Sequence, residues 1–163
     1  MVKVEFLKYN NSYSFLWIDG YLWMWDTPQE RELQKELAEN SHGDVLVVGY
    51  GLGIVQAYLE KNPNVKSVTS VEKYEEVIQK CKKEFGEVTG EVIITDFYDL
   101  LEDKKYDCVI GDIWPDINAK FLKDYLDFKE KSGKILKKGG KILAWGEDYF
   151  EYLIEKNNKN SKT

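Results

Sequence analysis

The chain has 163 residues, of which 43% are hydrophobic, and its 29 acidic and 23 basic side chains give a formal net charge of −6. This length and composition are typical of one domain with a hydrophobic core, and they exclude a disordered or collagen-like chain. Nucleic-acid binders usually carry a basic stripe, so for an acidic chain with one arginine, Arg31, we expect no nucleic-acid partner.

Cysteine and histidine are scarce in this sequence. Cys81, Cys108 and His42 offer neither zinc-ligand spacing nor a disulfide framework, so we expect no metal site. The first residues lack an apolar stretch of signal-peptide length, and no apolar run approaches about 18 residues. We therefore expect a protein of the reducing cytoplasm without a membrane partner.

Aromatic and β-branched residues dominate positions 2–25, with breaks at Asn10-Asn11 and Asp19-Gly20. This pattern predicts a small β-meander over residues 1–26. Thr27-Pro28 then begins a helix that ends near residues 40–43, because proline suits the first helical position. Leu33 and Leu37 share one face of that helix.

From Asp44 onward, short β-branched runs alternate with helical stretches. This alternation predicts a Rossmann-like α/β fold, a doubly wound parallel sheet of five strands with helices on both faces. We expect a single domain with this core at residues 27–156, a last helix at Tyr149 to Lys156 and a frayed tail at 157–163. The predicted strands are 45–48, 67–71, 91–94, 107–110 and 141–145, and the predicted helices between them are 54–60, 74–85, 97–101 and 119–136.

Three alternate glycines, Gly49, Gly51 and Gly53, follow the first parallel strand and precede a helix. Glycines permit a tight turn and let a ligand approach the backbone amides. Glu72 ends the second strand, 23 residues after Gly49, where a carboxylate can accept hydrogen bonds from both ribose hydroxyls of a nucleoside. We therefore predict a nucleoside site at these residues, with Tyr50 and Lys73 beside them.

Spacing distinguishes between two cofactors. A dinucleotide fingerprint has its third glycine at the sixth position, whereas Gly53 is at the fifth. The G-x-G-x-G loop resembles that of class I S-adenosylmethionine-dependent methyltransferases. In that superfamily an acid and an apolar residue after the third strand flank the adenine, and Asp96-Phe97 occupies this place. The fourth strand runs to the active site, here Gly111 to Asp116. Val47 departs from the pattern, because many members carry an acid there.

Two families within this superfamily look closest. Residues 16–20, Leu-Trp-Ile-Asp-Gly, are similar to the N-terminal hairpin of spermidine synthases, which also have an apolar residue at the Val47 position and a catalytic Asp at the Asp112 position. Leu52 stands where those enzymes usually carry an Asp that receives the donor amine. This difference counts against aminopropyl transfer.

Guanidinoacetate methyltransferase is the other family. Trp25-Asp26-Thr27-Pro28 resembles its W-E-T-P, residues 49–54 resemble its G-F-G-M-A-I, and Asp112 with Pro115 resembles its D-T-Y-P. The resemblance implies that acids at the Asp26 and Asp112 positions hold a guanidine group. The final antiparallel hairpin of that fold is missing after the fifth strand, so its substrate contacts do not carry over.

Together these resemblances imply an S-adenosylmethionine-dependent methyltransferase that acts on a small amine or guanidine. The residues for this role are Asp112 as the base that takes a proton from the acceptor nitrogen, also near the cofactor, and Asp26 as its catalytic partner. Asp26, Glu30 and Asp116 would line an acidic pocket for the cation, and Trp114 would form its aromatic wall. The alternatives are a spermidine synthase-like aminopropyltransferase and a non-catalytic nucleoside-binding protein.

The fifth strand would lie at an edge of the sheet, and proteins usually cover such edges. We therefore expect either a homodimer or coverage of this edge by the N-terminal meander.

Overall fold

The structure is a computed structural model that describes residues 2–9, 13–114 and 116–162. The expected turn at Asn10-Asn11 and the motif residue Pro115 lie outside the described residues.

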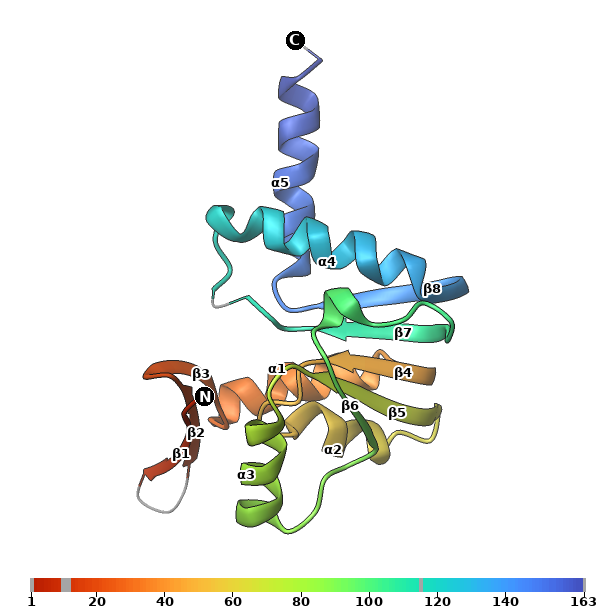
Figure 1. The fold of residues 1–163 in the computed structure, drawn as a ribbon. Coiled ribbons are helices and arrows are strands. Elements are labelled where there is room, and N and C mark those ends of the chain that lie inside the picture. The colour runs from red at the N-terminus through yellow and green to blue at the C-terminus, as the bar shows by residue number, and fades with distance from the viewer. Residues whose placement is uncertain (1, 10–12, 115, 163) are drawn as a thin grey trace.

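An antiparallel meander forms the N-terminal part of the fold (Figure 1). Its strands are β1 (Val4–Tyr9), β2 (Tyr13–Ile18) and β3 (Tyr21–Trp25), in the order β1-β2-β3. The turn between β2 and β3 uses Asp19, whose φ of 49° is left-handed, and Gly20. The predicted meander is confirmed.

A five-stranded parallel sheet follows, in the order β6-β5-β4-β7-β8, which confirms the predicted fold class. Its strands are connected by helices and by two 3₁₀ turns. The remaining elements are α1 (Pro28–Glu39), β4 (Gly43–Val48), α2 (Ile54–Glu60), β5 (Val65–Glu72), α3 (Glu75–Phe85), β6 (Glu91–Ile94), η1 (Phe97–Asp99), β7 (Tyr106–Gly111), η2 (Ala119–Phe121), α4 (Leu122–Lys134), β8 (Leu136–Ala144) and α5 (Glu147–Asn160).

Both faces of the parallel sheet are buried, which explains its continuous apolar runs. Side chains alternate across a strand, so Leu46 and Val48 of β4 pack with α4 and α5 on one face. Val45 and Val47 pack with α1 and α2 on the other face. The central strand therefore lies between two helical layers.

The meander lies at the carboxyl ends of the parallel strands (Figure 1). Its inner residues Val4, Leu16 and Ile18 pack on the glycine loop and on α3, and this contact closes one side of the space above the sheet. Within the described residues the meander does not cover β8, which lies at the far end of the strand order. The prediction of edge coverage by the meander is therefore wrong, and the homodimer stays a prediction.

Two C-terminal boundaries differ from the predicted ones. β8 begins at Leu136, inside the stretch predicted as helix, because α4 ends at Lys134 just after Ser132-Gly133. α5 begins at Glu147, where Gly146 supplies a left-handed cap, and it continues to Asn160. Residues 157–160 are therefore helical rather than frayed. No helix among the described residues is long and apolar enough to cross a membrane.

Candidate functional site

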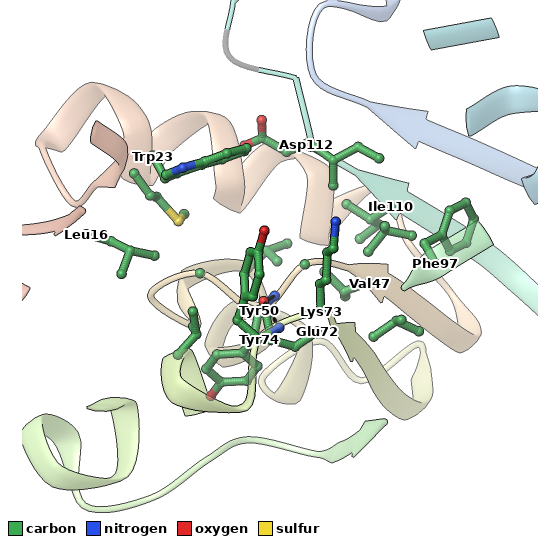
Figure 2. A pocket seen from close by; sticks show the side chains of 18 of the residues that line it. Leu16, Trp23, Val47, Tyr50, Glu72, Lys73, Tyr74, Phe97, Ile110 and Asp112 are labelled. Atoms are coloured by element: carbon green, nitrogen blue, oxygen red, sulfur yellow. Dashed lines mark hydrogen bonds between the residues drawn. The ribbon is translucent and has the colours of Figure 1, made fainter. Parts of the chain in front are cut away.

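A cavity of about 300 Å³ lies between the carboxyl ends of the parallel strands and the meander (Figure 2). Eight residues that the sequence singled out line it: Gly49, Tyr50, Gly51, Glu72, Lys73, Asp96, Phe97 and Asp112. The topology brings them together because β4, β5, β6 and β7 are neighbours whose carboxyl ends meet at one edge.

The glycine loop at 49–53 has a backbone that other residues would strain. Gly51 has a φ of 57°, and a Cβ there would clash with the Met24 side chain of the meander. Gly53 has a φ of 74°, and a Cβ there would lie 2.7 Å from the Tyr50 hydroxyl. Gly53 caps α2 and does not belong to the lining of the cavity. The loop is therefore fixed by two close approaches, one to the meander and one within the loop itself.

Tyr50 forms part of the cavity wall, and its side chain is anchored at the far end. The residue is buried, and its hydroxyl accepts a hydrogen bond from the Thr89 amide at 3.1 Å. Its predicted position along the cofactor agrees with its place in the lining.

Glu72 ends β5 and holds the glycine loop. Its Oε2 accepts a hydrogen bond from the Tyr50 amide at 2.8 Å, and its Oε1 accepts one from the Tyr74 amide at 3.1 Å. Burial raises the pKa of this carboxyl, and the backbone hydrogen bonds partly offset that effect. Each carboxylate oxygen has a second lone pair, so Glu72 retains the capacity to accept from two hydroxyls of a ligand.

Lys73, Asp96 and Phe97 border the cavity beyond Glu72. The Lys73 Nζ lies 3.6 Å from an oxygen of Asp96, and Asp96 caps the 3₁₀ turn η1 by accepting from the Tyr98 amide. The buried ring of Phe97 packs against Phe128 in the core, with ring centroids 5.7 Å apart. An acid and an aromatic residue therefore border the same part of the cavity, and the adenine position that the resemblance implies for them stays a prediction.

Asp112 follows β7 directly and lines the cavity beside Ile113. Its backbone position depends on Gly111, because a Cβ on that glycine would collide with the ring of Phe128. Phe128 is fully buried and also packs against Trp114, with ring centroids 5.6 Å apart. The aromatic core therefore determines where the carboxylate stands.

Burial, together with the nearby charge of Glu30, raises the pKa of the Asp112 carboxyl to about 7. Gln34 acts in the opposite direction, because its Nε2 donates a hydrogen bond to Asp112 Oδ2 at 3.0 Å. A carboxyl group with a pKa close to neutrality is suited to take and release a proton.

Asp26 was expected in this acidic pocket, but the structure gives its oxygens other partners. One carboxylate oxygen accepts from the Ser14 amide, and the other from Arg31 at 3.0 Å. Asp26 is buried and does not belong to the lining of the cavity. The cap of α1 is Thr27. Asp26 therefore connects β2 to the start of α1.

The other predicted acceptor residues also differ in position. Trp114 is buried among Tyr125, Phe128 and Phe150, and its indole donates to the carbonyl of Trp145 at 3.0 Å. Asp116 is exposed and accepts from the Ile117 amide. Glu30 is buried behind the lining, close to Asp112. Of the acids predicted to bind the substrate, only Glu30 acts on Asp112.

Several lining residues were not predicted from the sequence, notably Trp23, Met24 and Gln34. Trp23 is 47% exposed although it is one of the largest side chains. Figure 2 shows its ring at the edge of the cavity, on the same side as Asp112. The exposure of Trp23 and its place near the glycine loop are visible only in the structure, so the sequence offered no signal for it. The signal for Gln34 was its place four residues after Glu30, on one helical face.

Solved structures with the same fold are methyltransferases and spermidine synthases. Spermidine synthase from Thermotoga maritima matches with a TM-score of 0.64 at 18% identity, over 88% of this chain and 53% of that one. A methyltransferase from Clostridium acetobutylicum matches at 0.53 and 16% identity, over 73% and 50%. The plantazolicin methyltransferase BpumL in complex with SAH matches at 0.55 and 20% identity, over 73% and 48%.

These likenesses establish the fold as that of class I methyltransferases. This chain spans about half the length of those proteins. No curated protein sequence matches it significantly. The family model of guanidinoacetate N-methyltransferase matches residues 5–157, and the chain therefore belongs to that family.

Proposed function

We propose that this protein is an S-adenosylmethionine-dependent methyltransferase that methylates a nitrogen of a small amine or guanidine compound. The observation that carries the proposal is that Asp112 lines the same cavity as the glycine loop and Glu72. A base and a nucleoside site thus share one cavity. Membership of a methyltransferase family supports the same reaction class.

The cofactor fits the residues that are present. The cavity of about 300 Å³ reaches the lower end of the usual size range for small-molecule sites, and Glu72 keeps lone pairs for ribose hydroxyls. Asp96 and Phe97 border the side predicted for adenine. When bound, the cofactor supplies a methyl group already activated on a sulfonium. Val47 lines the cavity and offers no charge to the methionyl end.

The protein's own contribution is then alignment, water exclusion and proton transfer. The acceptor nitrogen donates a proton to the Asp112 carboxylate, and its lone pair forms the N–C bond as the S–C bond breaks and its electron pair leaves with sulfur. Because the pKa of Asp112 is about 7, a large fraction of its carboxyl group is ionised at neutral pH and can accept a proton. Trp23 offers an exposed aromatic face at the rim, and such faces attract ammonium and sulfonium groups.

Binding and turnover test this function separately. Calorimetry should detect S-adenosylmethionine binding that is tighter than binding of its decarboxylated form. A screen of amines and guanidines with labelled donor should then reveal methyl transfer to at least one cation. A protein that binds neither nucleoside would contradict the proposal.

Aminopropyl transfer is the second candidate, because the likeness to spermidine synthase covers 88% of this chain. Tighter binding of the decarboxylated donor would favour it. Nucleoside binding without turnover on any acceptor would favour a non-catalytic role. We place the protein in the cytoplasm because both cysteines are free thiols.

A further inference from the structure

The buried face of α1 carries polar residues at helical spacing. Glu30 and Gln34 are both buried, at 9% and 2% exposure, and Ala38 continues the same face toward the sheet. Buried polar side chains are costly unless they are hydrogen-bonded, so this face requires an explanation beyond packing. Leu33, by contrast, is 42% exposed.

Gln34 bridges two carboxylates. Its Nε2 donates to Glu30 Oε1 at 2.8 Å and to Asp112 Oδ2 at 3.0 Å. A side-chain amide has two N–H bonds, and this arrangement uses both of them. Gln34 is also part of the cavity lining, so its remaining polar atom for a ligand is the carbonyl oxygen.

We propose that Gln34 is the positioning residue of the acceptor site: its amide nitrogen holds Asp112 and Glu30 together, and its carbonyl oxygen accepts an N–H of the acceptor. This inference rests on the proposed methyl transfer. Asp112 Oδ1 has no hydrogen-bond partner among the described residues and can accept a second N–H. Two acceptor oxygens from different elements then fix the direction of the nitrogen lone pair.

Glu30 takes the place that the family resemblance gave to Asp26. Asp26 is bound to Ser14 and Arg31, whereas Glu30 lies four residues later on α1 and reaches Asp112 through Gln34. The second carboxylate of the site, that of Glu30, therefore lies behind the Gln34 amide and not in the cavity lining. The ligand meets a neutral carbonyl and one carboxylate.

The charges around Asp112 have opposite effects on its proton. Glu30 on α1 favours the protonated acid, and the Gln34 hydrogen bond favours the carboxylate. The other titratable groups lining the cavity lie on β5 and in the segments after β4, β5 and β6: Tyr50, Glu72, Lys73, Tyr74, Asp96 and Tyr98. Removing Gln34 or the charge of Glu30 should therefore shift the Asp112 titration in opposite directions.

The test compares Gln34→Leu, Glu30→Gln and the control Gln29→Leu, which alters an exposed glutamine on the same helix. In Gln34→Leu the acid limb of the pH–rate profile should move to higher pH, and KM for the acceptor should rise at least about tenfold. In Glu30→Gln the limb should move to lower pH. Gln29→Leu should match the parent protein in both measurements.

Binding of the donor, measured by calorimetry, should stay within about twofold in all three variants, since none of them alters Glu72 or the glycine loop. Shifts in the same direction for Gln34→Leu and Glu30→Gln, or no shift in either, would overturn the proposal. If Gln34→Leu fails to fold, the sign of the Glu30→Gln shift alone decides between the outcomes.

A direct titration separates this inference from the proposed function. Carbon NMR of the Asp112 carboxyl in the parent and variant proteins reports the same opposite shifts without any turnover. Opposite shifts in a protein that methylates no amine would contradict methyl transfer while supporting the bridge. Turnover with an unmoved Asp112 titration would contradict the bridge alone.

Discussion

The two ends of the parallel sheet treat their acids in opposite ways. At the carboxyl ends, burial raises the pKa of Asp112 to about 7 and also raises that of Glu72. At the amino ends, Asp44 and Asp107 both pair with Lys137, at 2.9 and 3.0 Å, and their pKa values are lowered. Aspartates at the two ends of the sheet therefore differ in how tightly they hold a proton.

This contrast has a physical cause. Asp44 also accepts from the Ser67 hydroxyl, and its hydrogen bonds with Ser67 and Lys137 outweigh burial and lower its pKa to about 2. Asp112 has one donor, Gln34, and a carboxylate neighbour, Glu30. A fully satisfied acid cannot act as a base near neutral pH, so the site requires an acid that is incompletely satisfied.

The largest expected effect is on turnover in Asp112→Asn. The amide cannot take the acceptor proton, so kcat should fall about 10²- to 10⁴-fold while donor binding persists. Initial rates with labelled donor and calorimetry measure the two quantities. Asp124→Asn, an exposed acid on α4, is the matched control. Full activity in Asp112→Asn would mean that the acid at the carboxyl ends of the strands has no more part in turnover than the acids at the amino ends.

Asp112→Asn should also stabilise the fold at high pH. A raised pKa in the folded state means that the folded protein binds the proton more tightly between about pH 4 and pH 7. Stability from this group therefore falls as pH rises through that range, and the variant avoids the loss. Urea unfolding at pH 5 and pH 8 checks this, because the gain should be larger at pH 8.

Glu72→Ala should weaken donor binding about 10- to 100-fold, because a carboxylate that can accept two ribose hydrogen bonds is lost. Calorimetric titration with S-adenosylmethionine measures the change. Glu75→Ala removes an exposed acid at the start of α3 and should bind as the parent does. Unchanged binding in Glu72→Ala would show that this acid only holds the loop.

Asp26→Ala should lower the free energy of unfolding by about 1–3 kcal/mol, because the Ser14 amide and Arg31 lose their partner. Urea unfolding at pH 7 measures it, with Glu32→Gln as an exposed control. If Asp26 were catalytic, Asp26→Ala would instead abolish turnover and leave the free energy of unfolding unchanged. Asp26 would then act in the reaction together with Asp112.

Lys137→Met should have the smallest effect, a small decrease in the melting temperature, because this lysine is 41% exposed and solvent screens its ion pairs. The two carboxylates stabilise the fold above their unfolded pKa near 4, and this contribution is lost as pH falls toward about 2. The difference in melting temperature from the parent should therefore be present at pH 7 and disappear near pH 2. Lys138→Met is the control.

Much of the fold followed from the sequence, because alternating β-branched runs and helices leave few arrangements. The meander, the five parallel strands and the glycine loop belong to local patterns of this kind, whereas the order of the strands in the sheet was not predicted. β8 was predicted too short because Lys137 to Gly140 lack apolar residues, although their backbone continues the strand. Strand ends of this type depend on pairing with β7, which a single segment cannot reveal.

Site residues could be predicted from the sequence only where the position of the backbone brings them to the cavity. Glu72, Asp96 and Asp112 each lie at the end of a strand or just after it, so the sheet topology brings them together. Asp26 and Trp114 have suitable chemistry but other partners, Arg31 for one and the Trp145 carbonyl for the other. Gln34 was missed because an amide on a helix has no motif of its own. Side-chain pairing across elements decides such roles, and the sequence does not record it.

The collision between a side chain at Gly111 and the ring of Phe128 limits which substitutions this protein can accept during evolution. Almost any mutation of Gly111 would displace the aromatic core and the base together, so lineages that adopt new acceptors should keep this glycine. Adaptation is open instead on α1 and the meander, where Gln34 and Trp23 line the cavity from elements outside the parallel sheet. Directed evolution for a new acceptor should therefore randomise those two elements and leave the end of β7 intact.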